Sequence, residues 1–87
     1  MSEAPRVTYP CEYPIKVMAR TGPELRSQLD VIVARHAGPL EAERISERAS
    51  SQGNFTGVTY LILAHSEAQI AALFADLKQC PDVMLVL

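Results

Sequence analysis

The stretch Phe55–His65 constrains the fold more than any other feature, because it is apolar or strand-forming at nearly every position. Alternate residues of a strand point to opposite faces, so this stretch has two faces to bury. A strand that is apolar on both faces is typical of the interior of a sheet, and the sequence therefore predicts a central strand here. One face carries Val58, Tyr60, Ile62 and Ala64, and the other carries Thr59, Leu61, Leu63 and His65.

Three further segments predict strands around it. Residues 13–20 alternate between two kinds of side chain, which indicates one buried face, and residues 83–87 form a short apolar strand. Glu41–Ala49 is mostly polar, which is typical of an edge strand, because charged side chains discourage pairing with other chains. The turn-forming residues 50–54 lie between this strand and the central one, so we expect a β-hairpin there.

Two segments show helical periodicity. Thr21 and Glu24 have the spacing of a capping box, in which two side chains satisfy free backbone N–H groups at a helix start, and Ser66 and Gln69 repeat this spacing. Gly38, followed by a proline, ends the first helical pattern. The apolar stripes are Leu25, Leu29, Ile32, Val33 and His36 in the first helix and Ile70, Leu73, Phe74 and Leu77 in the second.

The order of elements is β-α-β-β-α-β along 87 residues, which is the length of one domain. Right-handed crossovers with both helices on one face give the ferredoxin-like solution of this order. We therefore predict an α+β fold, a ferredoxin-like βαββαβ two-layer sandwich with an antiparallel sheet of order 4-1-3-2 and two helices on one face. The domain is expected at residues 12–87, after a flexible N-terminal arm at residues 1–11 that contains Pro5 and Pro10.

Composition and charge disfavour several classes of function. The net charge is −2, so the chain lacks the basic character of nucleic-acid binders, and no nucleic-acid partner is expected. No apolar run approaches the roughly 20 residues of a membrane span, and the first residues lack the apolar core of a signal peptide. The two cysteines do not form a disulfide framework, so we expect a cytoplasmic protein with no membrane contact.

One end of the predicted sandwich collects groups that suit an anion. The end of the first strand, the start of the first helix and the hairpin loop meet there in this topology. Backbone N–H groups at a helix start, two arginines and several hydroxyl groups are suitable ligands for an anionic effector. The alternative is that these residues only cap the helix and solvate the loop. The candidate effector-binding residues are Arg20, Thr21, Gly22, Arg48, Ser50, Ser51, Gly53 and Asn54.

The opposite end is predicted to hold Cys11, His36 and His65. A cysteine and two histidines have the chemistry of metal ligands, or of a nucleophile with its base. They come from three segments without motif spacing, and His36 belongs to the inward stripe of its helix. We therefore expect no catalytic residues, no metal site and no cofactor. A small enzyme that uses these three side chains stands as an alternative.

The face of the sheet away from the helices is predicted to be largely apolar. A contiguous apolar patch on a small domain is typical of a contact surface. The alternative is a strand register shifted by one residue, which would turn the same side chains into the core. The outward positions lack the aromatic side chains of an RNA-binding sheet. The predicted interaction face consists of Lys16, Met18, Leu61, Leu63, Met84 and Val86.

Five short segments share the pattern of a known family: Lys16–Met18, Gly22–Leu25, Arg35–Ala37, Ser50–Phe55 and Met84–Leu87. Together they resemble the YbeD-like family of small bacterial proteins of unknown function, from about residue 12 to the C-terminus. The resemblance implies a ferredoxin-like fold similar to ACT regulatory domains, which bind amino acids or other small effectors at the interface of paired domains, and it supplies no catalytic residues. His65 and residues 38–45 depart from the family pattern, which leaves the second strand's register open.

The sequence thus predicts a small regulatory or interaction module that acts by self-association, partner binding or small-effector binding rather than by catalysis. The expected partners are a second copy or another protein on the open sheet face, and a small-molecule effector. The alternative is an adaptor that binds one protein and has no ligand.

Overall fold

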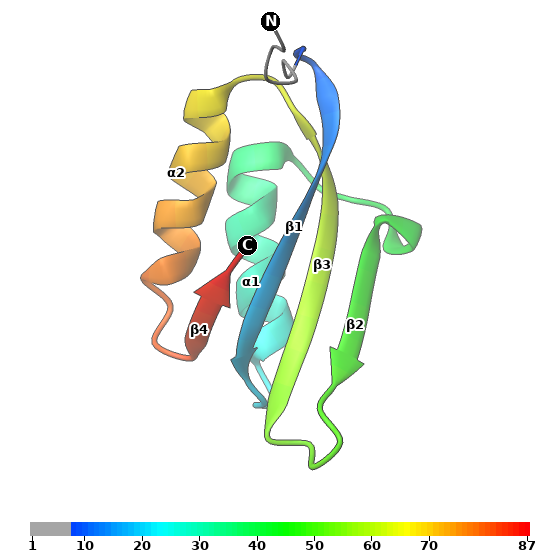
Figure 1. Ribbon diagram of the computed structural model, residues 1–87, viewed down its shortest axis with the longest axis vertical. Helices are drawn as coiled ribbons and strands as arrows, with labels where there is room; N and C mark the ends of the chain where they lie inside the picture. Colours follow the sequence, from blue (N-terminus) through cyan, green and yellow to red (C-terminus); the bar gives the residue numbers. More distant parts are fainter. Residues whose placement is uncertain (1–7) are drawn as a thin grey trace, which may run out of the picture.

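The structure, a computed structural model, describes residues 8–87, which form a four-stranded antiparallel sheet and two α-helices (Figure 1). The predicted N-terminal arm falls mostly outside these residues, and the first strand begins at Cys11. Neither α-helix has the length and apolar run needed to cross a bilayer. The bounds are β1 Cys11–Arg20, α1 Leu25–Ala37, a 3₁₀ helix Ala42–Arg44, β2 Ile45–Ala49, β3 Phe55–Ala64, α2 Glu67–Lys78 and β4 Val83–Val86.

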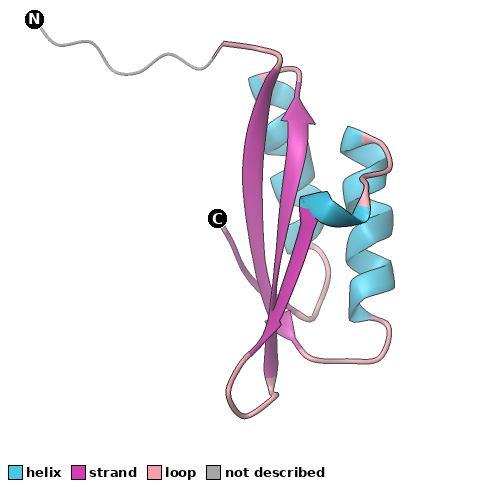
Figure 2. Cartoon of the chain, turned by 90° about the vertical axis from the view of Figure 1, so that its right-hand side faces the viewer, coloured by secondary structure: helices cyan, strands magenta, loops and turns pink. Residues whose placement is uncertain are grey.

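The sheet has the order β2-β3-β1-β4, which is the predicted 4-1-3-2 order counted from the other edge. The two long strands, β1 and β3, pair antiparallel along their whole length at its centre, and the shorter β2 and β4 form its edges. Both helices lie on one side of the sheet, and the other side is open (Figure 2). The ferredoxin-like α+β prediction is therefore confirmed.

The core lies between the sheet and the helices, where the predicted inward faces of the strands meet the helical stripes. Burying each large aliphatic side chain contributes about 1.5–3 kcal/mol, so this cluster is the main source of stability. The predicted faces of the first and central strands are both confirmed. The core residues are Ile15, Val17, Ala19, Leu25, Leu29, Val33, Val58, Tyr60, Ile62, Ala64, Ile70, Leu73, Leu77 and Val86.

One predicted N-cap forms and the other does not. Ser66 Oγ accepts a hydrogen bond from the N–H of Gln69 at 3.0 Å, as predicted for α2. Thr21 does not cap α1, because the helix begins only at Leu25. Its hydroxyl instead lies 2.7 Å from the hydroxyl of Thr56 on β3. A tertiary partner 35 residues away has therefore replaced the local motif.

Both predicted turns contain a glycine in the left-handed region of backbone space. Gly38 ends α1 with φ of 79°, and its N–H donates to the carbonyl of Ala34 at 2.9 Å. Gly53, with φ of 75°, lies in the hairpin loop, and its N–H donates to the carbonyl of Ser50 at 2.9 Å. A side chain is strained at such φ values, so glycine is the residue that both turns require.

The predicted register of the last strand is wrong. Val86 lies opposite Val17 and is only 7% exposed, so it belongs to the core and not to the open face. Leu85 lies opposite Met18 and is half-exposed, and Leu87 follows two residues later. These two leucines therefore occupy the open face in place of Val86.

The cause is an irregularity in the pairing of β1 with β4. Val83 lies opposite Ala19, and Leu85 lies opposite Met18, so Met84 is an additional residue on β4. Such a β-bulge changes the alternation of the strand at that point. Met84, which was predicted for the open face, is 54% exposed at this bulge.

Candidate functional site

The open face of the sheet is the first candidate, because nothing in residues 8–87 covers it. The odd-numbered residues of β1 between Ile15 and Ala19 are buried, so its even-numbered residues point outward. Four of the six residues predicted for this face lie on it, namely Lys16, Met18, Leu61 and Leu63. The role of this face in contacts stays a prediction.

The open face contains a hollow of about 370 Å³ over β1, β3 and β2. Gly57 of β3 lies at its floor, between Met18 on one neighbouring strand and Arg48 on the other. The next row across the three strands consists of Lys16, Thr59 and Ser46. Ser50 and Glu47 also line the hollow, which thus combines two cationic residues with three hydroxyl residues, one thioether and one acidic residue.

The structure divides the predicted effector-binding residues between the two faces of the sheet. Arg48 and Ser50 line the hollow, and Arg20 lies on the same open face by strand alternation. The start of α1 lies on the opposite face, and the Thr21 hydroxyl is engaged with β3. The arginines and the helix start therefore do not face one common site. The remaining predicted residues lie in loops and do not line the hollow: Gly22, Ser51, Gly53 and Asn54.

Cys11, His36 and His65 lie toward the predicted end of the molecule but do not form a site. Cys11 pairs with Ala64, next to His65, and the side-chain amide of Gln69 donates to the carbonyl of His36 at 2.9 Å. The ring of His36 is bonded to Asp76, with 2.8 Å between Nε2 and Oδ2. In the part of the chain that the structure describes, no three potential metal ligands come together.

The contact of His36 with Asp76 links α1 to α2. Arg35 donates from Nη1 to the same carboxylate oxygen at 2.9 Å. These two donors, His36 first, hold the pKa of the Asp76 carboxyl below its ordinary value. The pair of bonds connects the two helices on the side away from the sheet's open face.

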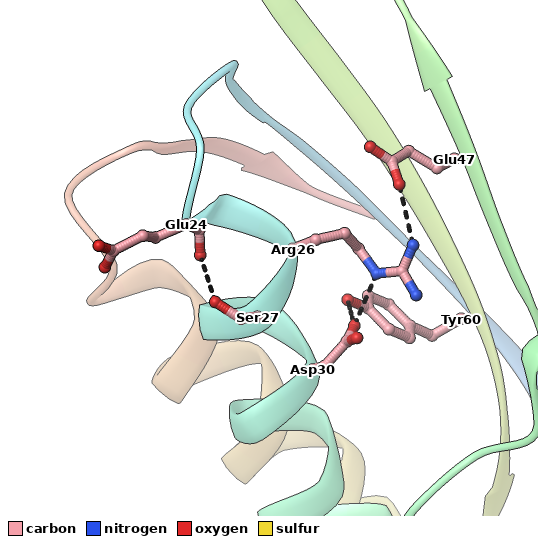
Figure 3. A network of polar contacts seen from close by, with 6 residues as sticks. All are labelled: Glu24, Arg26, Ser27, Asp30, Glu47 and Tyr60. Atoms are coloured by element: carbon pink, nitrogen blue, oxygen red, sulfur yellow. Dashed lines mark hydrogen bonds and ion pairs between the residues drawn. The ribbon is translucent and has the colours of Figure 1, made fainter.

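A second polar network ties α1 to β2 and β3 (Figure 3). The phenol of Tyr60 donates to Asp30 Oδ1 at 2.6 Å, and Arg26 Nε donates to the same oxygen at 2.9 Å. Arg26 also donates from Nη1 to Glu47 Oε1 at 2.8 Å. The network therefore extends from the core to the edge of the sheet.

The proton of the Tyr60 phenol is held within this network. Burial and the hydrogen bond to Asp30 raise the pKa of Tyr60 well above its ordinary value, so its phenol stays neutral. A neutral phenol that already donates its proton to a carboxylate is not available as a base. The i, i+4 spacing of Arg26 and Asp30 was a signal in the sequence, but nothing there pointed to Tyr60 as the third member.

The fold and the open face define a small ferredoxin-like α+β protein with one uncovered sheet surface. Within this class, the chain belongs to the family described as a protein of unknown function, DUF493, whose model matches residues 4–87. The resemblance to YbeD-like bacterial proteins is thereby confirmed.

Curated relatives and solved structures agree with this assignment. A "UPF0250 protein" of Hahella chejuensis is 38% identical over 85 residues, covering 98% of this chain and 93% of the relative. The UPF0250 protein PSPA7_1111 of Pseudomonas paraeruginosa is also 38% identical, over 86 residues that cover 98% of this chain and 92% of the relative. The solution structure of HP0495 from H. pylori has a TM-score of 0.74 at 19% identity, covering 99% of this chain and 90% of that one, and it shows the same fold.

Proposed function

We propose that this protein is a non-catalytic interaction module whose working unit is two copies joined along β4. The observation that carries the proposal is the apolar edge of the sheet at its C-terminal strand, where no side chain is charged. Met84, Leu85 and Leu87 are 54%, 50% and 62% exposed. An exposed strand edge with apolar side chains and no charge is a template for adding another strand.

The backbone of β4 supports such pairing. Leu87 exchanges two hydrogen bonds with Lys16 on β1, with N···O distances of 2.8 and 3.0 Å. Strand alternation turns the N–H and C=O of Val86 the other way, toward the free edge. A second β4 related by a twofold axis satisfies these groups in an antiparallel pair, which gives one sheet of order 2-3-1-4-4-1-3-2.

The chemistry of the edge favours a second copy as the occupant. In a twofold contact each patch meets itself, so a self-pairing edge must bury no unpaired charge. The segment Val83–Leu87 carries no charged side chain. The apolar side chains of one copy then cover those of the other.

A non-catalytic role agrees with how the reactive side chains are used. His36 is bonded to Asp76, and Tyr60 is a neutral donor to Asp30. Cys11 and Cys80 are free thiols, which supports a reducing, cytoplasmic location as part of the proposal.

The solution mass of the purified protein, measured by light scattering across a dilution series, tests the proposal. We expect twice the chain mass at high concentration and a fall toward one chain on dilution. The double variant Leu85→Lys, Leu87→Lys should stay at the mass of one chain, because it brings like charges together across the twofold axis.

The matched control is Val31→Lys, which adds a charge at a 58% exposed apolar side chain of α1. It should form pairs as the natural protein does. A natural protein that is a single chain at every concentration would contradict the proposal, as would a Val31→Lys variant that dissociates like the double variant.

A further inference from the structure

Gly57 lines the hollow on the open face and leaves space in it, because this residue has no side chain. This glycine lies inside β3, the central strand, where its neighbours Thr56 and Val58 are buried. Glycine within a strand is less stable than alanine by roughly 0.5–1 kcal/mol, so its presence calls for a local reason. Such a glycine often marks a place where a ligand approaches the backbone closely.

Neither the backbone nor its neighbours require glycine at this position. The φ values above zero belong to Gly38 and Gly53, and Gly57 is not among them. A Cβ built on Gly57 would lie 3.7 Å from Met18 Cε and 3.8 Å from the carbonyl oxygen of Arg48, which is ordinary contact. A larger residue therefore fits the fold but would fill the hollow.

The hollow contains two cationic side chains. Lys16 and Arg48 lie on the two strands that flank Gly57, and both are exposed. Among the residues from 8 to 87, neither of them forms an ion pair with a carboxylate, whereas Arg26, Arg35 and Arg44 each do. The two cations are thus available to a ligand.

Glu47 lines the hollow, and the carboxylates of Glu47 and Glu12 are both bonded to arginines outside it. Glu47 lies beside Arg48 on β2, but its carboxylate is bonded to Arg26 on the helix side of the sheet at 2.8 Å. Glu12 lies on the open face of β1, and its carboxylate is bonded to Arg44. The positive charge of Lys16 and Arg48 is therefore not cancelled within the hollow.

We infer that this hollow binds a small anionic molecule through a carboxylate or phosphate group held between Lys16 and Arg48. The hydroxyls of Thr59 and Ser46 lie in the same row as Lys16 and add hydrogen-bond donors. The thioether of Met18 and the uncovered Cα of Gly57 leave room for an apolar part of the molecule. The inference rests on the proposed non-catalytic binding role, and it does not depend on pairing along β4.

The test is a titration of the ¹⁵N-labelled protein with inorganic phosphate and, separately, with succinate, followed by amide NMR shifts at constant ionic strength. We expect saturable shifts at residues 46–48 and 57–59. The variant Lys16→Gln, Arg48→Gln should weaken binding by roughly tenfold or more, because it removes both charge-assisted contacts. The variant Arg35→Gln, Lys78→Gln removes the same charge from the helix layer and should bind as the natural protein does.

A second variant separates binding from folding. Gly57→Val should fold at least as stably as the natural protein, because a branched residue suits a strand, yet lose binding by roughly tenfold or more because it fills the hollow. Saturation by both probes supports a general anion site, and saturation by one assigns that group as the ligand. Shifts that never saturate, or that survive both Lys16→Gln, Arg48→Gln and Gly57→Val, would overturn the inference. Light scattering of the same variants measures pairing along β4 independently. A failure of anion binding would therefore leave the conclusion about pairing unchanged.

Discussion

β2 and β4 occupy the two edges of the same sheet, yet their side chains differ in charge and in what holds them. β2 contains Glu47 and Arg48, and Arg44 precedes it. Arg44 donates to the carbonyl of Leu61 at 3.0 Å, and Glu47 is bonded to Arg26 on α1. Polar contacts therefore hold this edge, and its charges discourage the addition of another strand.

The backbone of β4 pairs with β1, and among the described residues its side chains make apolar contacts. Val86 is buried in the core, and Val83 packs against the same cluster. α2 packs against this strand, whereas α1 reaches β2 through the bond of Arg26 to Glu47 (Figure 1). Among the described residues, the β2 edge carries charged side chains that discourage pairing with other chains, and the β4 edge carries the exposed leucines instead.

The largest expected effect comes from putting a charge on the inward side of β4. Val86→Asp should lower the free energy of unfolding by about 3 kcal/mol or more, because it leaves an unpaired carboxylate in the core. Leu85→Asp should cost about 1 kcal/mol or less, because that side chain points to the open face. Urea denaturation of both variants, at a dilution where single chains prevail, measures the difference.

This pair of variants also tests the register of the strand. A Leu85→Asp variant that is destabilised as much as Val86→Asp would mean that Leu85 is a core residue. The bulge at Met84 would then be misplaced, and the apolar edge that supports pairing would be smaller.

A smaller effect is expected from the polar network that reaches the β2 edge. Tyr60→Phe keeps the buried ring but removes the donor to Asp30, so it should lower the free energy of unfolding by about 1–2 kcal/mol. Tyr13→Phe is the matched control, because no hydrogen bond of the Tyr13 phenol is found within residues 8–87. It should change stability by about 0.5 kcal/mol or less. Equal losses in the two variants would mean that the network does not hold β2.

The same network predicts a pH dependence. The pKa of Tyr60 is raised in the folded protein, whereas an unfolded tyrosine has a pKa of about 10. The stability that Tyr60 contributes is therefore complete below about pH 10 and is lost as the pH rises above it. Denaturation of the natural protein should show a steeper loss of stability above pH 10 than denaturation of Tyr60→Phe, and parallel curves would contradict the raised pKa.

The sequence predicted the fold because most elements carry a pattern that only one structure satisfies. The alternation of β1 and the stripe of α2 each differ in polarity between their two faces. Residues 83–87 are apolar at every position, so no polarity difference could fix their register, and Val86 was assigned to the wrong face. The predicted N-cap at Thr21 is wrong for another reason. The Thr21 hydroxyl is hydrogen-bonded to Thr56 on β3, and a local capping pattern carries no information about such a tertiary contact.

The candidate site was predicted only in part. Arg48 and Ser50 were expected to bind an anion, but together with the start of α1, which lies on the other face of the sheet. Strand alternation places the side chain of Arg48 on the face of the sheet opposite the start of α1, so the two would not have been assigned to one site. Gly57 was missed, although a single glycine inside an otherwise apolar and branched strand was visible in the sequence as a signal.

The smallest effect is expected where the two halves of the molecule are joined. Arg26 connects α1 to β2, and α2 packs against β4. Asp76 connects the two helices through His36 and Arg35. His36→Ala removes the donor that contributes most to the lowered pKa of Asp76, so this pKa should rise toward the value of a free aspartate. Arg35→Ala should raise it less. A carboxyl NMR titration measures both changes.

The consequence for stability follows from the direction of the shift. A lowered pKa means that the contribution of Asp76 is complete above the ordinary aspartate value of about 3.9 and is lost as the pH falls through the lowered value. The thermal midpoints of the natural protein and His36→Ala should therefore differ slightly near neutral pH and converge in strong acid. In His36→Ala, the amide hydrogen-exchange rates of β2 and β4 should change by the same factor, because the link lies between the helices and not at either edge. Faster exchange in β4 alone would show that α2, and not the apolar contacts of Val86, holds the β4 edge in place.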